Sequence, residues 1–266
     1  MLILYDNPFS TNAQKVRLVM AEKGIAYESN ILDLQAGDQF DPDFMKLNPA
    51  AQVPTLRDGD KLFTESTVIS EYLEDAYPGA SLMPRDSAHK AEMRWLTEQT
   101  IGWMSPMINS LNVGLVFRHI YAGKSAEEMA AFWAANPNPI QLQRQKSCAE
   151  EGVNSPYIPI ALRRYRTLIL TLNARLENAG PWLAGETFSL ADTGLFPYLS
   201  RLDLMGFERL TYGAAAYAEW LAAMRARPSV QTEITDKIPK NALAVHREFV
   251  ARDQSALDGM LAELGV

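Results

Sequence analysis

Residues 48–56 read Asn-Pro-Ala-Ala-Gln-Val-Pro-Thr-Leu, and residues 64–67, a short way downstream, read Thr-Glu-Ser-Thr. An Arg-Asp-Gly-Asp turn at residues 57–60 lies between the two stretches. Asp-Gly between two strand-like runs is a strong signal for a β-hairpin. We therefore expect a hairpin with strands over residues 53–56 and 61–63, which leads directly into a helix.

Upstream of the hairpin, the chain alternates short strands with helical segments. The expected order is strand, helix, strand and helical turn, over residues 2–5, 12–23, 26–32 and 44–47. A last helix over residues 64–77 closes the unit. A βαβ unit that feeds a ββα unit gives a four-stranded mixed sheet, and its first helix begins beside the end of the first strand. Sheets of this kind usually bind ligands at that crevice.

The composition changes after Pro84, where the mixed pattern gives way to helices broken by a few turns. We therefore predict an α/β plus all-α protein, with one domain over residues 1–80 and an all-helical bundle domain over residues 87–266. Within the second domain, residues 122–156 hold two short helical pieces around Asn-Pro-Asn-Pro, and we interpret them as an insertion that caps a pocket. The remaining helices are expected over residues 87–121, 158–176, 187–204, 214–226 and 242–264.

The charge and hydropathy patterns exclude several kinds of partner. The formal net charge is −7 and the 25 lysines and arginines are interspersed with 32 acidic residues, so no basic stripe is available for nucleic acid. No run approaches the ~18 apolar residues of a membrane span, and residues 1–10 lack the pattern of a signal peptide. We expect a cytoplasmic protein without a membrane partner.

Cysteine and histidine usage argues against disulfide and metal chemistry. Cys148 is the single cysteine, which excludes an internal disulfide and a Cys-x-x-Cys pair. The histidines at positions 89, 119 and 246 have no partner at ligand spacing, and no His-Glu-x-x-His motif occurs. No metal site is expected.

Ser10, Thr11 and Asn12 lie at the start of the first helix, immediately after the first strand. Unpaired N–H groups and the positive end of the helix dipole favour an anion there, and a thiolate is such an anion. Ser10 or Asn12 could donate the hydrogen bond that keeps a thiol ionised. These residue types are also the favourite N-caps of helices, so a purely structural role is the alternative.

The second motif surrounds Val53 and Pro54. If the Val53–Pro54 bond is cis, the backbone before it turns outward, and an extended peptide can pair with it like an additional strand. Glu65 and Ser66, at the start of the closing helix, can hold the amino and carboxylate groups of such a peptide. The alternative is a hairpin start followed by an ordinary helix cap.

Taken together, these features resemble the glutathione transferase family over essentially the whole chain. They are the first strand, the Ser-Thr-Asn helix start, Val53-Pro54, Glu65-Ser66 and the all-helical second half. The resemblance implies a thioredoxin-like first domain of the order βαβαββα and glutathione as co-substrate. It further implies that Ser10 or Asn12 activates the glutathione sulfur and that the other candidates bind the tripeptide. Val53 would bind its cysteinyl backbone, Glu65 and Ser66 its γ-glutamyl end, and Gln52 and Gln39 the remainder. A homodimer is expected by the same resemblance.

Within that family, the chain looks similar to bacterial β-aryl etherases of lignin breakdown. The stretches that carry this similarity are residues 52–54 with 64–75, Lys-Ser-Ala-Glu-Glu at 124–128, and residues 139–146. The implied reaction is attack of the glutathione thiolate on the carbon of a β-aryl ether, with release of a phenol from a hydrophobic aromatic electrophile. A general detoxifying transferase or a glutathione-dependent isomerase is the alternative enzyme, and a non-catalytic protein-interaction module is the alternative of another class. Disulfide exchange is not expected, because no cysteine lies at residues 10–12.

Three further expectations concern packing. Tyr5 lies within the first strand and is assigned to packing. Ser189 and Asp192 form a capping-box pattern that starts a helix. An aromatic and methionine stripe offers walls for the second-substrate pocket, although such a stripe is more often core. Its members are Phe9, Trp103, Met104, Met107, Phe117 and Tyr121.

Overall fold

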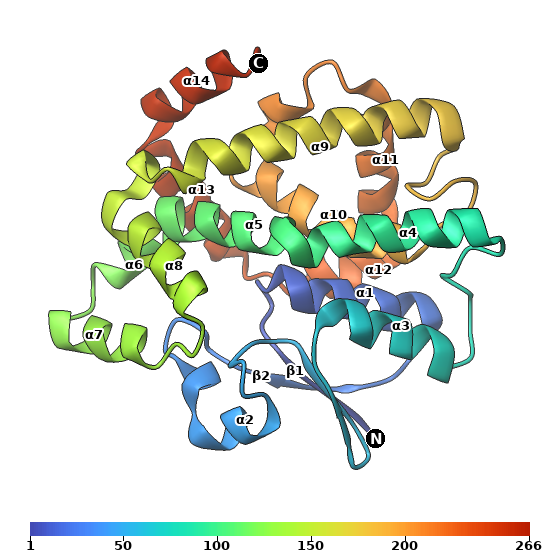
Figure 1. Cartoon of the computed structure of the whole chain (residues 1–266), viewed down its shortest axis with the longest axis horizontal. Helices are drawn as coiled ribbons and strands as arrows, with labels where there is room; N and C mark the ends of the chain where they lie inside the picture. Colours follow the sequence, from blue (N-terminus) through green and yellow to red (C-terminus); the bar gives the residue numbers. More distant parts are fainter.

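The computed structural model describes residues 1–266 and contains one four-stranded sheet (Figure 1). The strands are β1 (Leu2–Asp6), β2 (Glu28–Ile31), β3 (Thr55–Asp58) and β4 (Lys61–Phe63), in the order β2-β1-β3-β4. β1 pairs with β2 in parallel and with β3 antiparallel, and β3 and β4 form the predicted hairpin. β3 begins at Thr55 and not at Val53 as predicted, because Pro54 has no N–H to donate to a ladder.

Three helices complete this unit. α1 (Thr11–Lys23) and α3 (Ser66–Ala76) pack together between the sheet and the helical half of the molecule, whereas α2 (Pro42–Leu47) lies at the other side of the sheet (Figure 1). Tyr5 is half-buried and packs against Phe44 of α2, with ring centroids 5.7 Å apart, which confirms the packing role predicted for it. The predicted thioredoxin-like order βαβαββα is confirmed.

The second half of the chain is entirely helical, as predicted. A nearly continuous rod consists of α4 (Ser87–Gln99), α5 (Ser105–Asn112) and α6 (Arg118–Tyr121), joined by π-helical segments at Thr100–Met104 and Val113–Phe117. The bundle further contains α9 (Tyr157–Ala179), α10 (Leu190–Leu204), α11 (Ala215–Ala226), α12 (Pro228–Val230), α13 (Lys240–Ala251) and α14 (Gln254–Glu263). No helix of the chain combines the length and apolarity that a membrane crossing needs.

α10 begins with the capping box that the sequence predicts. Ser189 accepts a hydrogen bond from the N–H of Ala191, and Asp192 accepts one from the N–H of Ser189 at 2.9 Å. The Asp192 carboxylate also accepts from the N–H of Leu183 and from the indole of Trp220. One buried carboxylate therefore joins α10 to α11 and to the turn before it.

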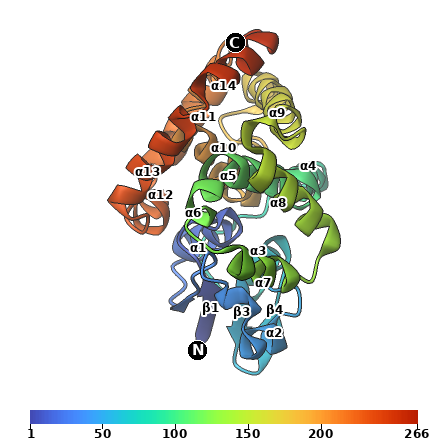
Figure 2. The ribbon, with the colours of Figure 1, turned by 90° about the vertical axis from the view of Figure 1, so that its left-hand side faces the viewer.

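The predicted insertion forms α7 (Ala126–Ala134) and α8 (Pro139–Glu151). Figure 2 shows this pair on the face that looks toward the viewer, next to the first domain. Phe132 of α7 packs edge-on against Phe40 at 5.4 Å, and Gln141 of α8 accepts a hydrogen bond from Gln52 at 3.1 Å. The insertion therefore contacts the thioredoxin-like unit directly.

Candidate active site

One cavity of about 520 Å³ lies where α1, α3, the rod and the insertion meet. All seven residues singled out from the sequence line it: Ser10, Asn12, Gln39, Gln52, Val53, Glu65 and Ser66. They come from four separate stretches of the first eighty residues. The fold thus brings the predicted site residues together around a single space.

Ser10 is both the N-cap of α1 and a cavity residue. Its Oγ accepts a hydrogen bond from the N–H of Ala13 at 3.2 Å, which is the capping role considered above. Accepting this bond leaves the hydroxyl hydrogen free to donate into the cavity. The structural and chemical roles of Ser10 are therefore compatible.

Asn12 lies in the first turn of α1 and does not cap it. Its Nδ2 donates to Ser105 Oγ at 3.2 Å, and its Oδ1 accepts from the phenol of Tyr198. A primary amide carries two N–H donors, so one remains for a ligand in the cavity. Ser105 and Tyr198 belong to the helical half, which therefore orients the Asn12 amide.

Val53 presents an unpaired backbone to the cavity. The Val53–Pro54 bond is cis, and neither the N–H nor the C=O of Val53 makes a hydrogen bond within the chain. Gln39 has a buried Oε1 without a partner. These groups are free to pair with the backbone of an extended ligand.

The N-terminus of α3 is the second anion-binding position. Glu65 has φ +64°, a conformation that is costly for a residue with a side chain and that tends to occur at functional sites. No side chain caps α3, so its first N–H groups lack a side-chain acceptor. A carboxylate at Ser66 would satisfy them, and the Glu65 carboxylate lines the same cavity for an amine.

The chain is similar in sequence and fold to known proteins. A family model for the N-terminal domain of glutathione S-transferases matches residues 4–81, which contain all seven candidates. The glutathione S-transferase TCHQD of Arabidopsis thaliana is 30% identical over 237 residues, and the match covers 87% of this chain and 88% of that protein. The chain belongs to the glutathione S-transferase family.

Two further relatives extend the similarity. The protein LigF of Sphingobium sp. strain SYK-6 is 28% identical over 259 residues, which cover 94% of this chain and 99% of LigF. The crystal structure of the beta-etherase LigF matches with a TM-score of 0.80 over 88% of this chain and 99% of that one. A stringent starvation protein A homolog from Pasteurella multocida is 26% identical over 242 residues, covering 91% of this chain and 94% of that protein. The predicted glutathione transferase architecture is thus confirmed.

The stripe of pocket candidates divides into two groups. Phe9, Phe117 and Tyr121 line the cavity of this transferase, in line with the prediction. Trp103, Met104 and Met107 do not, and the prediction was wrong for these three, which belong to the main hydrophobic core.

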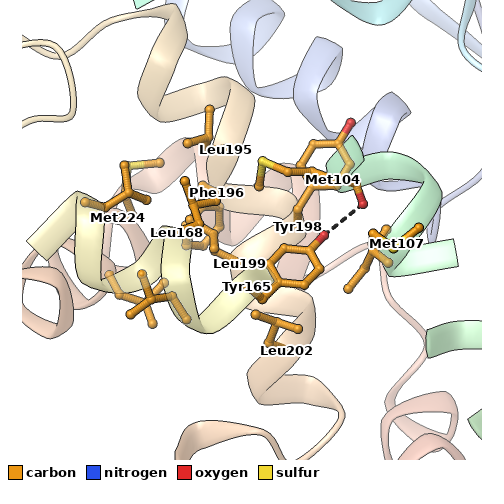
Figure 3. Close-up of a cluster of buried hydrophobic side chains, with 14 of the residues drawn as sticks. Met104, Met107, Tyr165, Leu168, Leu195, Phe196, Tyr198, Leu199, Leu202 and Met224 are labelled. Atoms are coloured by element: carbon orange, nitrogen blue, oxygen red, sulfur yellow. Dashed lines mark hydrogen bonds between the residues drawn. The ribbon is translucent and has the colours of Figure 1, made fainter. Parts of the chain in front are cut away.

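The core role of Met104 and Met107 follows from the packing of α9 and α10 against the rod. Figure 3 shows both side chains among residues of those helices, and the dashed line marks the 2.8 Å hydrogen bond from Tyr165 to the carbonyl of Met104. The pocket face of the rod is instead the one that carries Ile108, Asn109, Asn112 and Phe117.

Several cavity residues were not predicted from the sequence. The insertion supplies Phe132, Gln141, Arg144 and Gln145, and α10 supplies Arg201. The side chain of Arg201 is 3% exposed and donates to the carbonyl of Phe9 at 2.6 Å. The only available signal was the amide- and arginine-rich run at residues 141–145 within a segment already assigned to the pocket.

A buried lysine lies behind the α3 terminus. Lys15 is 1% exposed, and its ammonium donates to Thr67 Oγ1 at 2.5 Å and to Thr100 Oγ1 at 2.9 Å. Burial away from water lowers the pKa of Lys15 to about 7, against the attraction of nearby acids such as Glu65. This side chain joins α1, α3 and the rod directly beneath the site.

Proposed function

We propose that this protein is a glutathione-dependent transferase whose bound glutathione thiolate attacks an electrophilic carbon of a second substrate. The observation that carries the proposal is the convergence of Ser10, Asn12, the unpaired Val53 backbone and the open α3 terminus on one cavity. In this proposal Ser10 and Asn12 stabilise the thiolate, Val53 pairs with the cysteinyl backbone, and Glu65 and Ser66 hold the γ-glutamyl end. Gln52 and Gln39 contact the remainder.

These groups can supply the free energy that is needed to ionise the glutathione thiol. Lowering a thiol pKa by about two units from its usual ~8.5 requires roughly 2.7 kcal/mol. One hydrogen bond to a charged group contributes about 1.5–3 kcal/mol, and a helix N-terminus adds about 0.3–1 kcal/mol. Ser10 and Asn12 together provide two donors, which would lower the pKa of the thiol further than one donor does. Proximity of thiolate and electrophile would supply most of the remaining rate enhancement.

For the second substrate, we propose a β-aryl ether of the lignin type, cleaved by substitution at the carbon that bears the ether, with a phenolate leaving. The similarity to the beta-etherase LigF supports this choice. The cavity wall supports it too, because it combines aromatic rings from Phe9, Phe117 and Phe132 with amide side chains. Aromatic rings suit the aryl groups, and amides suit the hydroxyl, carbonyl and ether oxygens of such a compound.

The proposal includes a homodimer in the cytoplasm. Large apolar side chains are exposed on consecutive elements, namely Leu62 of β4, Val68 of α3 and Trp95 of α4, with 42%, 55% and 49% of their surfaces exposed. A second copy would cover them. The cytoplasm keeps thiols reduced, as a glutathione thiolate requires. Light scattering of the purified chain should give twice the monomer mass, and a monomer would contradict the dimer.

The function is tested with glutathione and two electrophiles, a generic aryl halide and a β-aryl ether whose leaving phenol is fluorescent. Glutathione-dependent turnover of both supports the etherase. Turnover of the aryl halide alone would retain a general transferase or an isomerase and reject the etherase. Turnover of neither would favour the alternative of another class, a non-catalytic interaction module.

A further inference from the structure

The cavity contains two cations that no acid of the chain neutralises. Several arginines that are buried or half-buried pair with an acidic residue, among them Arg17, Arg118 and Arg227. Arg144 and Arg201, the two arginines that line the cavity, make no ion pair. Arg201 nevertheless uses its guanidinium within the protein, on the Phe9 carbonyl and on Asn112. Arg144 differs, since it makes no hydrogen bond at all and its buried Nε lacks a partner. An unpaired, partly desolvated guanidinium is a position for an external anion.

Glutathione carries a carboxylate at each end, and the thioredoxin-like unit can neutralise only one of them. The γ-glutamyl carboxylate has the N-terminus of α3 at Ser66. No lysine, arginine or histidine of the first eighty residues lines the cavity. The glycyl carboxylate of a bound glutathione would therefore lack a cation unless the helical half supplies one.

The position of Gln52 indicates which of the two arginines lies near the glycyl end of a bound glutathione. If the cysteinyl residue pairs with Val53 and the γ-glutamyl end lies at Ser66, the glycyl end extends to the other side of Val53, toward Gln52. The side chain of Gln52 donates to Gln141 of α8 at 3.1 Å. Arg144 follows Gln141 by three residues, so both lie on the same face of α8, and both line the cavity.

We infer that Arg144 binds the glycyl carboxylate of glutathione, so that the insertion completes the glutathione site. The inference rests on the proposed function, because it takes glutathione as the ligand. It assigns the insertion a second task besides forming the pocket of the electrophile. A charged arginine also suits the planar carboxylate, which it can hold through two parallel N–H groups.

The test is isothermal titration of the wild type, Arg144→Gln and Lys146→Gln with two ligands. One ligand is glutathione, and the other is its ethyl ester, in which the glycyl carboxylate is neutral. Lys146→Gln is the matched control, because it removes a positive charge from the same helix at a side chain that does not line the cavity. Thermal melting of each variant shows that it is folded.

We expect Arg144→Gln to weaken glutathione binding by about tenfold to a hundredfold, the range of one charge-assisted hydrogen bond, and to change ester binding by less than about twofold. Lys146→Gln should bind both ligands as the wild type does. Unchanged glutathione binding in Arg144→Gln, or equal losses for glutathione and the ester, would overturn the inference alone. A wild type that binds neither ligand would overturn the proposed function as well.

Discussion

The phenol of Tyr198 donates a hydrogen bond to Asn12 Oδ1 across the junction of the two halves of the molecule. Asn12 belongs to α1 and Tyr198 to α10, which pack closely against each other. Because the carbonyl end of the Asn12 amide is held by Tyr198, its nitrogen is directed toward Ser105 and the cavity. The helical half therefore sets the orientation of a donor that we propose acts on the glutathione sulfur.

Tyr198→Phe tests this relationship. The variant loses the bond to Asn12, and we expect the pKa of the bound glutathione thiol to rise by roughly one unit, equivalent to about 1.4 kcal/mol. The measurement is the thiolate absorbance near 240 nm as a function of pH, in protein saturated with glutathione. Tyr165→Phe is the control, since its buried hydroxyl bonds the carbonyl of Met104 instead. Equal shifts in both variants would show a general effect of packing.

Ser10 has two roles, which two substitutions separate. Ser10→Ala removes both the cap and the donor, so we expect a loss of about 1 kcal/mol in the free energy of unfolding together with a loss of conjugation activity. Ser10→Asp keeps a good N-cap but provides no hydroxyl donor and adds a negative charge near the sulfur. It should therefore unfold like the wild type and be inactive. Full activity in Ser10→Asp would mean that Ser10 only caps α1.

The buried Lys15 should make the free energy of unfolding depend on pH. With a folded-state pKa of about 7 and an unfolded value of roughly 10.4, the unfolded chain holds a proton between these values that the folded chain does not. Stability should then rise with pH through this window. Between pH 7 and 9 the wild type should gain up to about 2.7 kcal/mol relative to Lys15→Met, measured by urea unfolding at both values. Parallel pH profiles for the two proteins would contradict the prediction.

α7 also begins with a capping box, formed by Ser125 and Glu128, and this box and the one of Ser189 and Asp192 in α10 should differ in their contribution to stability. Asp192→Ala leaves the N–H of Leu183, the N–H of Ser189 and the indole of Trp220 without an acceptor in the core, and we expect a loss of about 3 kcal/mol or more. Glu128→Ala in the exposed box of α7 should cost about 0.5–1 kcal/mol. Denaturant unfolding of both variants gives the comparison. Similar losses would show that the Asp192 network adds little beyond the cap.

Local signals in the sequence predicted much of this structure. The Asp-Gly turn predicted the β3–β4 hairpin, and the Ser189 and Asp192 pair predicted the start of α10. Both features depend on interactions between residues that are near in sequence. Five of the site residues could be named because they lie at helix starts or beside Pro54, whereas Gln39 and Gln52 were named through the family resemblance. Their convergence on one cavity needed the fold.

Other features depend on which faces of distant helices meet. Met104 and Met107 have the spacing of a pocket wall, but α9 and α10 cover them, and a helical period does not say what lies opposite. Tyr198 bonds Asn12 across 186 residues of sequence, and Gln141 bonds Gln52 across 89 residues. No local pattern indicates such pairings.

Mass spectrometry of the reaction products shows whether a glutathione thiolate substitutes at the carbon of a β-aryl ether. The purified protein is incubated with glutathione and a racemic β-aryl ether model compound, with Ser10→Asp as the folded, inactive control. We predict equal amounts of a glutathione thioether and a free phenol with the wild type, and neither product with Ser10→Asp. Absence of the thioether with the wild type, or its formation at the same rate with Ser10→Asp, would contradict this reaction at this site.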